Sequence, residues 1–115
     1  MRNLTMLTDL YQLTMMYGYY RCGMADRIGV FDLFFRKSPG GSGYAIAAGL
    51  EQAIDFINDL HFADEDLAYL RSLGLFDEDF LKLLKDFTFT GEIYAVPEGT
   101  VVFPYEPIIR VKAPI

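Results

Sequence analysis

The side chains that most often carry catalytic chemistry are scarce in this sequence. It holds one histidine, His61, and one cysteine, Cys22, among 115 residues. A metal site or a serine–histidine–aspartate triad would have to form almost without imidazole. His61 follows a predicted helix and is interpreted as a surface histidine, and Cys22 has no basic partner that would activate its thiol. Neither residue indicates a catalytic centre.

Tyr11 is the residue best suited to contact a planar ligand. It lies one turn into a predicted helix, on a stripe with Met15, Gly18 and Cys22. A flat amphipathic ring is what a heteroaromatic ligand stacks on. The alternative is a tyrosine of the core or of a protein interface, and the pattern alone leaves both interpretations open.

A glycine-rich segment, Pro39–Gly43, follows the basic residues Arg36 and Lys37. If it leads into a helix, its backbone N–H groups and the helix N-terminus could bind a phosphate. The segment lacks the Gly-Lys-Ser/Thr of a Walker loop and does not fit the dinucleotide-binding glycine pattern. A flexible connection between a strand and a helix is the competing interpretation.

Two acidic clusters and one turn have structural explanations. Asp64–Asp66 and Asp77–Asp79 each open a predicted helix, where the macrodipole favours negative charge, so they are interpreted as helix starts rather than catalytic carboxylates or metal ligands. The turn Val96–Val101 is similar to the hairpins of biotinyl and lipoyl carriers. Such carriers need a lysine at the tip, and none occurs between Asp86 and Arg110, which argues against a carrier role.

Composition limits the class of protein further. The length fits one domain, and 52% hydrophobic with 23% charged residues is typical of a globular chain. A net charge of −6 argues against nucleic acid or an anionic membrane as the main partner. The apolar runs are too short to span a bilayer, and the N-terminus lacks a secretory signal pattern. A lone cysteine fits a reducing compartment, so we expect a cytoplasmic protein.

A helix must position Tyr11, and its boundaries are readable. It is predicted from about Asp9 to Cys22, with Asp9 as the cap, Gln12 reaching back to the Asp9 N–H, and Gly23 ending it. One apolar stripe of this helix consists of Leu10, Leu13, Tyr17 and Tyr20. The core of so small a domain can cover one stripe, so the stripe that carries Tyr11 is predicted to contact a ligand or another polypeptide.

The remaining pattern predicts an α+β domain. A strand over Ile28–Lys37 puts Asp32 and Arg36 on one side, and three helices and several antiparallel strands follow. One helix is predicted from about Tyr44 to Leu60, a second is capped by Asp64 and ends at Gly74, and a third is capped by Asp77 and turns Phe80, Leu81, Leu84 and Phe87 inward. The strands are predicted over Thr88–Val96, Thr100–Phe103 and Ile108–Ala113. Since the sequence stops directly after a strand, we expect it to be a truncated form of a longer protein.

Several segments resemble the nicotinate phosphoribosyltransferase family in their order and approximate spacing. They are Thr8–Met15, Phe34–Pro39, Tyr44–Leu50, Val96–Gly99, Phe103–Pro104 and Val111–Pro114. Linked motifs in one order are more specific than any one of them, and together they cover nearly the whole chain. The resemblance implies the N-terminal domain of a type II phosphoribosyltransferase over residues 1–115, with the catalytic α/β barrel of the family absent.

The resemblance also implies an activity. In this family nicotinate displaces diphosphate from 5-phosphoribosyl 1-diphosphate to give nicotinate mononucleotide, a step of NAD salvage. ATP hydrolysis is coupled through a phosphorylated histidine of the barrel, which His61 does not match. ATP and Mg²⁺ are therefore implied for the full enzyme, and no cofactor is expected in this fragment. The family works as a homodimer in which the N-terminal domain completes the partner's active site.

By the same resemblance, three residues are substrate-binding. Tyr11 matches the tyrosine that stacks on the pyridine ring, Asp9 lies beside it, and Arg36 matches an arginine near the phosphoribosyl donor. No catalytic residue and no metal ligand is expected here, and the fragment is expected to be inactive alone. The competing hypothesis is a non-catalytic binding or assembly domain of the barrel-sandwich kind, which would use the same apolar stripe for protein contact.

Overall fold

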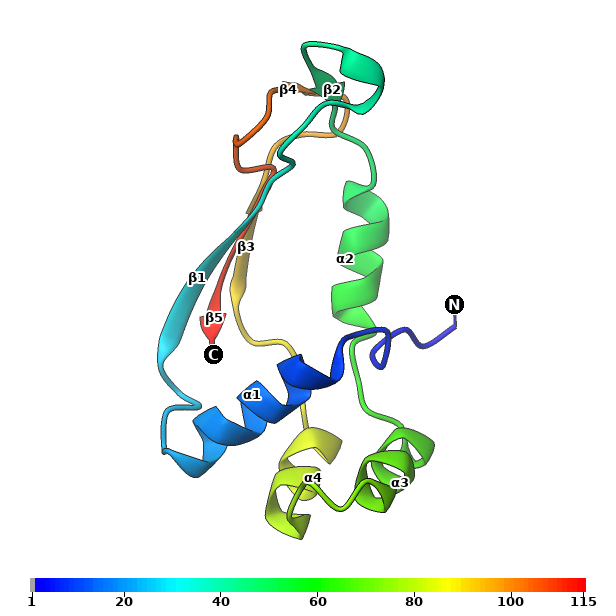
Figure 1. Cartoon of the computed structure of the whole chain (residues 1–115), viewed down its shortest axis with the longest axis vertical. Coiled ribbons are helices and arrows are strands. Elements are labelled where there is room, and N and C mark those ends of the chain that lie inside the picture. The colour runs from blue at the N-terminus through cyan, green and yellow to red at the C-terminus, as the bar shows by residue number, and fades with distance from the viewer. Residues whose placement is uncertain (1) are drawn as a thin grey trace. The chain divides into compact units, whose positions relative to one another are not determined.

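The computed structural model describes residues 2–115, and it confirms the predicted α+β class (Figure 1). In chain order the elements are α1 (Leu10–Arg21), β1 (Ile28–Leu33), the 3-10 helix η1 (Pro39–Gly41), β2 (Ala45–Ile46), α2 (Leu50–Asn58), α3 (Asp64–Ser72), α4 (Glu78–Lys85), β3 (Glu92–Ala95), β4 (Val101–Val102) and β5 (Ile109–Pro114). Within these residues no helix is long and apolar enough to cross a membrane.

The chain divides into two compact units. The first unit contains the residues up to Arg27, residues 56–89 and Ile115, and so holds α1, α3 and α4. The second unit contains residues 28–55 and 90–114, and holds all five strands. α2 begins in the second unit and ends in the first.

Helices α1, α3 and α4 build the core of the first unit. Its buried members are Leu13, Phe62, Leu67, Leu70, Phe80, Leu81 and Leu84. The rings of Tyr17 and Tyr20 pack on Phe80 with centroid distances of 5.1 and 5.7 Å. Leu13, Tyr17 and Tyr20 of the predicted stripe therefore face the core, whereas its fourth member, Leu10, is 50% exposed.

The ends of α1 follow from local chemistry. The helix starts after Asp9 and ends before Cys22, as predicted. The Asp9 N–H donates to Gln12 Oε1 at 3.2 Å, and Thr8 Oγ1 donates to the same oxygen. The Asp9 side chain makes no capping hydrogen bond, so only the Gln12 half of the predicted box forms. Gly23 ends the helix with a φ of +68°, a conformation that favours glycine.

The acidic clusters act at helix starts, in two different ways. Asp77 caps α4 as predicted, because its Oδ1 accepts from the Phe80 N–H at 2.8 Å. The predicted cap of α3 is wrong, since Asp64 is the first helical residue and Ala63 occupies the cap position. Asp66 instead reaches back and accepts from the Ala63 N–H at 2.8 Å.

An antiparallel sheet of three strands frames the second unit, in the order β1-β5-β3 (Figure 1). Residues Asp32, Arg110 and Tyr94 lie opposite one another across the three strands. A separate antiparallel pair, β2 and β4, joins Ala45 to Val102 and Ile46 to Val101. The predicted strands on either side of the Val96–Val101 turn thus belong to different sheets.

Strand β1 is shorter than the sequence predicted. It ends at Leu33, opposite Ile109, and does not continue to Lys37. The Ile108 N–H still donates to the Leu33 carbonyl at 2.8 Å, and the Tyr105 N–H donates to the Phe35 carbonyl at 2.8 Å, so contacts continue past Leu33 without regular strand pairing. The length of β1 thus depends on its pairing with β5, a strand far along the chain.

The predicted helix start at Tyr44 is also wrong, because α2 begins at Leu50. Non-local hydrogen bonds hold the preceding segment extended: the Ala47 N–H donates to Thr100 O, and Ala47 O accepts from the Gly99 N–H, both at 2.8 Å. Gly49 has a φ of +109°, which other residues rarely adopt. These contacts override the helical propensity of the alanines in this segment.

Candidate substrate-binding residues

The stripe of α1 that carries Tyr11 is not covered by the chain. Tyr11 is 59% exposed and Met15 47% exposed, whereas Leu13 between them is 4% exposed. Cys22 is exposed, and a Cβ built on Gly18 would meet no atom within 4 Å. The surface of α1 therefore offers an aromatic ring on a rigid helix with open space beside it, which confirms the prediction of a second, uncovered stripe.

Asp9 and Tyr11 lie on this first unit within one turn of each other. Asp9 is exposed, and its carboxylate makes no hydrogen bond or ion pair with residues 2–115. The Tyr11 carbonyl accepts from Thr14 Oγ1 at 3.0 Å, while the phenol has no partner in the same part of the chain. Both side chains are therefore free to meet a ligand.

Arg36 lies in the second unit, at a bend between β1 and η1, and its side chain is exposed. The sequence predicted the Asp32 carboxylate on the same side of the strand as Arg36, but Asp32 pairs with Arg110 instead. Arg110 donates to both oxygens of Asp32, from Nε at 2.6 Å and from Nη2 at 2.9 Å. These hydrogen bonds lower the pKa of Asp32. Within residues 2–115 the Arg36 guanidinium has no acidic partner and can contact an anion.

The glycine-rich segment, for which phosphate binding and a connection between a strand and a helix were both open, does not form a phosphate loop at a helix start. It contains η1 and leads into β2 rather than directly into a helix. The N-terminus of α2 is instead occupied by the Glu98 carboxylate, whose Oε2 accepts from the Gly49 and Leu50 N–H groups at 3.1 Å each. A carboxylate from the chain itself thus takes the place that a phosphate oxygen would fill.

Neither His61 nor Cys22 forms part of a catalytic or metal-binding cluster. His61 is exposed, with Nδ1 2.6 Å from the Asp59 carbonyl. Within residues 2–115 no group of three or more His, Cys, Asp or Glu side chains could hold a metal ion.

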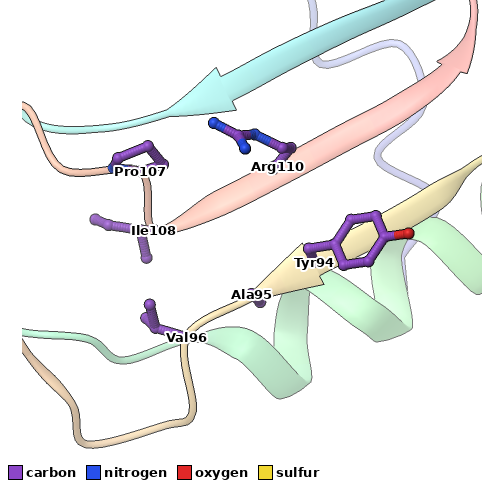
Figure 2. A pocket seen from close by; sticks show the side chains of 6 residues that line it. All are labelled: Tyr94, Ala95, Val96, Pro107, Ile108 and Arg110. Atoms are coloured by element: carbon purple, nitrogen blue, oxygen red, sulfur yellow. The ribbon is translucent and has the colours of Figure 1, made fainter.

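A hollow of about 500 Å³ opens on the sheet of the second unit (Figure 2). It is lined by Tyr94, Ala95, Val96, Pro107, Ile108 and Arg110. The sequence did not single out this place, because Tyr94, Arg110 and Asp32 meet only through the register of three strands. The Arg110 guanidinium is already bound by Asp32 of β1, and the Tyr94 hydroxyl donates to Glu92 Oε2 of its own strand at 3.0 Å, so both polar groups of the hollow have partners within the sheet.

Comparison with known proteins places the chain in a family. The family model described as the nicotinate phosphoribosyltransferase N-terminal domain matches residues 6–115, and so covers both units. The chain is 46% identical over 110 residues to a nicotinate phosphoribosyltransferase of Mycobacterium tuberculosis, covering 96% of this chain and 24% of that protein. It is 44% identical over 113 residues to the Bacillus subtilis nicotinate phosphoribosyltransferase, covering 98% and 23%.

A solved structure agrees with the sequence comparison. The crystal structure of human nicotinic acid phosphoribosyltransferase superposes with a TM-score of 0.84 at 37% identity, covering 93% of this chain and 22% of the human chain. The chain thus spans about a quarter of the length of these relatives. Sequence and fold lead to one conclusion: the chain belongs to the nicotinate phosphoribosyltransferase family and corresponds to its N-terminal domain.

Proposed function

We propose that this chain is the substrate-orienting N-terminal domain of an enzyme that converts nicotinate and 5-phosphoribosyl 1-diphosphate into nicotinate mononucleotide and diphosphate, for NAD salvage. Family membership supports the reaction. The observation that carries the role of this domain is the exposed Tyr11 ring on a helix whose other stripe is anchored in a core. That surface also argues for the enzyme over a separate assembly module, since it belongs to a segment shared with the family.

In the proposed reaction a bond forms between the pyridine nitrogen and C1 of the ribose as the bond from C1 to the diphosphate oxygen breaks. Positive charge develops on the ribose and negative charge on the departing diphosphate. An enzyme accelerates such a step by aligning the ring and stabilising the leaving group. Tyr11 would hold the plane of the ring by stacking, with Asp9 beside it.

Arg36 would act on the other reactant. A guanidinium presents donors in a planar fork that matches phosphate oxygens, and it keeps its charge at any working pH. Arg36 is exposed and unpaired in the part of the chain that the structure describes, whereas Arg110 of β5 is committed to Asp32. Of the two arginines, only Arg36 can serve the donor without breaking an existing ion pair.

The rest of the machinery would lie outside this chain. We propose that ATP hydrolysis, Mg²⁺ and the phosphorylated histidine belong to a barrel domain, and that the enzyme is a cytosolic homodimer. The Tyr11 stripe of one subunit would then complete the active site of its partner. On this proposal residues 1–115 alone bind substrates weakly and turn over none.

A hybrid enzyme tests the proposal. Residues 1–115 replace the matching segment of the Bacillus subtilis relative, with which they align over 113 residues. We expect the purified hybrid to form nicotinate mononucleotide from nicotinate and the diphosphate donor. Residues 1–115 without the barrel should form none under the same conditions.

Two controls make the result decisive. The unaltered Bacillus enzyme sets the reference rate, and cooperative thermal unfolding shows whether the hybrid is folded. A folded, dimeric hybrid that lacks activity with both substrates would contradict the proposed function. Turnover by residues 1–115 alone would contradict the assignment of the reaction chemistry to the barrel.

A further inference from the structure

The connection between β4 and β5 contains an unusual turn over residues 103–106. Pro104 is its second residue, and the Glu106 N–H donates back to the Phe103 carbonyl at 3.2 Å. The Glu106 carboxylate closes the turn again by accepting from the Phe103 N–H at 3.0 Å. The third residue, Tyr105, has a φ of +66°, and within residues 2–115 it is the only residue other than glycine with a positive φ.

Glycine or asparagine normally occupies this position. A type II turn has proline as its second residue and a positive φ at its third residue. A side chain on that third residue is sterically disfavoured. A tyrosine could be tolerated if its ring were buried, but Tyr105 is 68% exposed. Neither the backbone nor burial explains a large aromatic residue here. Strained residues of this kind cluster at functional sites.

The contacts of Tyr105 lead to the segment just before Arg36. Its N–H donates to the Phe35 carbonyl at 2.8 Å, and its ring lies 5.8 Å from the Phe34 ring at an interplanar angle of 34°. In this way the β4–β5 connection lies beside the end of β1 (Figure 1). Because the ladder between β1 and β5 stops at Leu33, Tyr105 provides the next link along the strand.

We propose that Tyr105 is a positioning residue for Arg36, and that its ring, rather than its backbone, supplies this role. The N–H would be present with any residue except proline, whereas the ring contact with Phe34 requires an aromatic side chain. Holding Phe34 and Phe35 against the turn fixes the backbone from which the Arg36 guanidinium projects. The inference rests on the proposed function, in which Arg36 contacts the phosphoribosyl donor.

The substitution Tyr105→Gly in the hybrid enzyme separates this role from a structural one. Glycine removes the ring, keeps the N–H and suits the positive φ, so the melting temperature should stay equal or rise. We expect the KM for the diphosphate donor to rise about 3- to 10-fold, as for a binding group held less firmly. The KM for nicotinate should stay unchanged. Tyr105→Phe keeps the ring and should behave as the parent hybrid.

Hydrogen exchange gives a readout that does not need the reaction. The amides of Phe35, Arg36 and Lys37 should exchange faster in Tyr105→Gly than in Tyr105→Phe, while the amides of α3 exchange alike. Unchanged exchange and an unchanged donor KM in Tyr105→Gly would overturn the inference. A lower melting temperature with both KM values raised would also overturn it, because that result describes a purely structural residue.

The variant Arg36→Ala keeps the two proposals distinguishable. If Arg36→Ala raises the donor KM and Tyr105→Gly adds nothing in that background, Tyr105 acts through Arg36. If the two effects multiply, Tyr105 acts independently and the inference fails. If Arg36→Ala leaves the donor KM unchanged, the proposed role of Arg36 fails, and with it the positioning role, even where exchange shows that Tyr105 orders the segment.

Discussion

At the scale of single residues, Tyr11 carries the clearest prediction. Tyr11→Ala in the hybrid enzyme should weaken nicotinate binding by about 1–2 kcal/mol, or roughly 5- to 30-fold in KM, because one aromatic stacking contact is lost. Steady-state kinetics with nicotinate varied at saturating donor measure this change. Tyr69 of α3 is 58% exposed, almost as much as Tyr11, so Tyr69→Ala is a matched control that should leave the KM unchanged. Equal kinetics for the two variants would remove Tyr11 from the site.

Arg36 makes a separate prediction on the other substrate. Arg36→Ala should raise the KM for the diphosphate donor by on the order of 30-fold, the usual loss for a hydrogen bond to a charged group, and should leave the nicotinate KM nearly constant. Arg27 is an exposed arginine with no ion-pair partner among residues 2–115, so Arg27→Ala controls for loss of one positive charge. Wild-type donor kinetics in Arg36→Ala would refute the assignment.

The sequence alone predicted that Tyr11 lies on an uncovered stripe of α1, because the residues that share this stripe are spaced three and four positions apart. It did not predict Tyr105, because the residue type gives no sign of a positive φ where glycine is absent. Nor did it predict that Asp32 pairs with Arg110, 78 positions further along. Such pairs depend on strand register, which a single sequence leaves undetermined.

At the scale of elements, Asp77 joins two helices of the first unit. Its Oδ1 caps α4, and its Oδ2 accepts from the Tyr17 hydroxyl and from Arg21 Nη1 of α1 at 3.0 Å each. The backbone hydrogen bond from Phe80, followed by the bonds from Tyr17 and Arg21, lowers the pKa of Asp77. The ionised carboxylate therefore stabilises both the start of α4 and its contact with α1.

The pH dependence of stability tests this role. A carboxylate whose pKa is lowered on folding adds stability above its unfolded pKa of about 3.9, and that stability is lost as the pH falls through the folded value. Asp77→Asn should thus lower the unfolding free energy at pH 7, and the difference from wild type should shrink as the pH falls below about 3.9. Urea denaturation across this range measures it. Asp79→Asn removes a charge from the same turn without a capping bond and should change little. A constant difference at every pH would contradict the account.

Elements defined by local signals were predicted well, and those defined by distant partners were not. The ends of α1 follow from Gln12 and Gly23, both within or next to the helix. The start of α2 depends instead on Glu98, which accepts from the Gly49 and Leu50 N–H groups, and the end of β1 depends on its pairing with β5; both partners lie far along the chain. Tertiary contacts override local propensity at both places, so no reading of the local pattern could have set these boundaries.

At the scale of the whole molecule, the distribution of charge matters more than its sum. The chain carries a net charge of −6, yet the proposed donor is a polyanion. Five basic side chains form ion pairs with acidic residues: Arg21, Arg71, Lys85, Arg110 and Lys112. Arg36 and Lys37 have no such pair within residues 2–115, so they concentrate free positive charge beside one loop. Two adjacent unpaired cations of this kind let an acidic protein bind an anion locally.

The proposed sharing of the active site between subunits makes a quantitative prediction. One hybrid subunit carries Tyr11→Ala, and the other is inactivated at the phosphorylated histidine of its barrel. At a nicotinate concentration well below the parental KM, each homodimer should be inactive or weak. After random mixing about half of the dimers are heterodimers, and each heterodimer has one intact site out of its two sites. About a quarter of the parental activity should therefore return. Activity is measured after denaturation and refolding of the mixture, with each variant refolded alone as control. If Tyr11 serves the barrel of its own chain, no intact site can form, and activity after mixing would stay at the level of the separate variants.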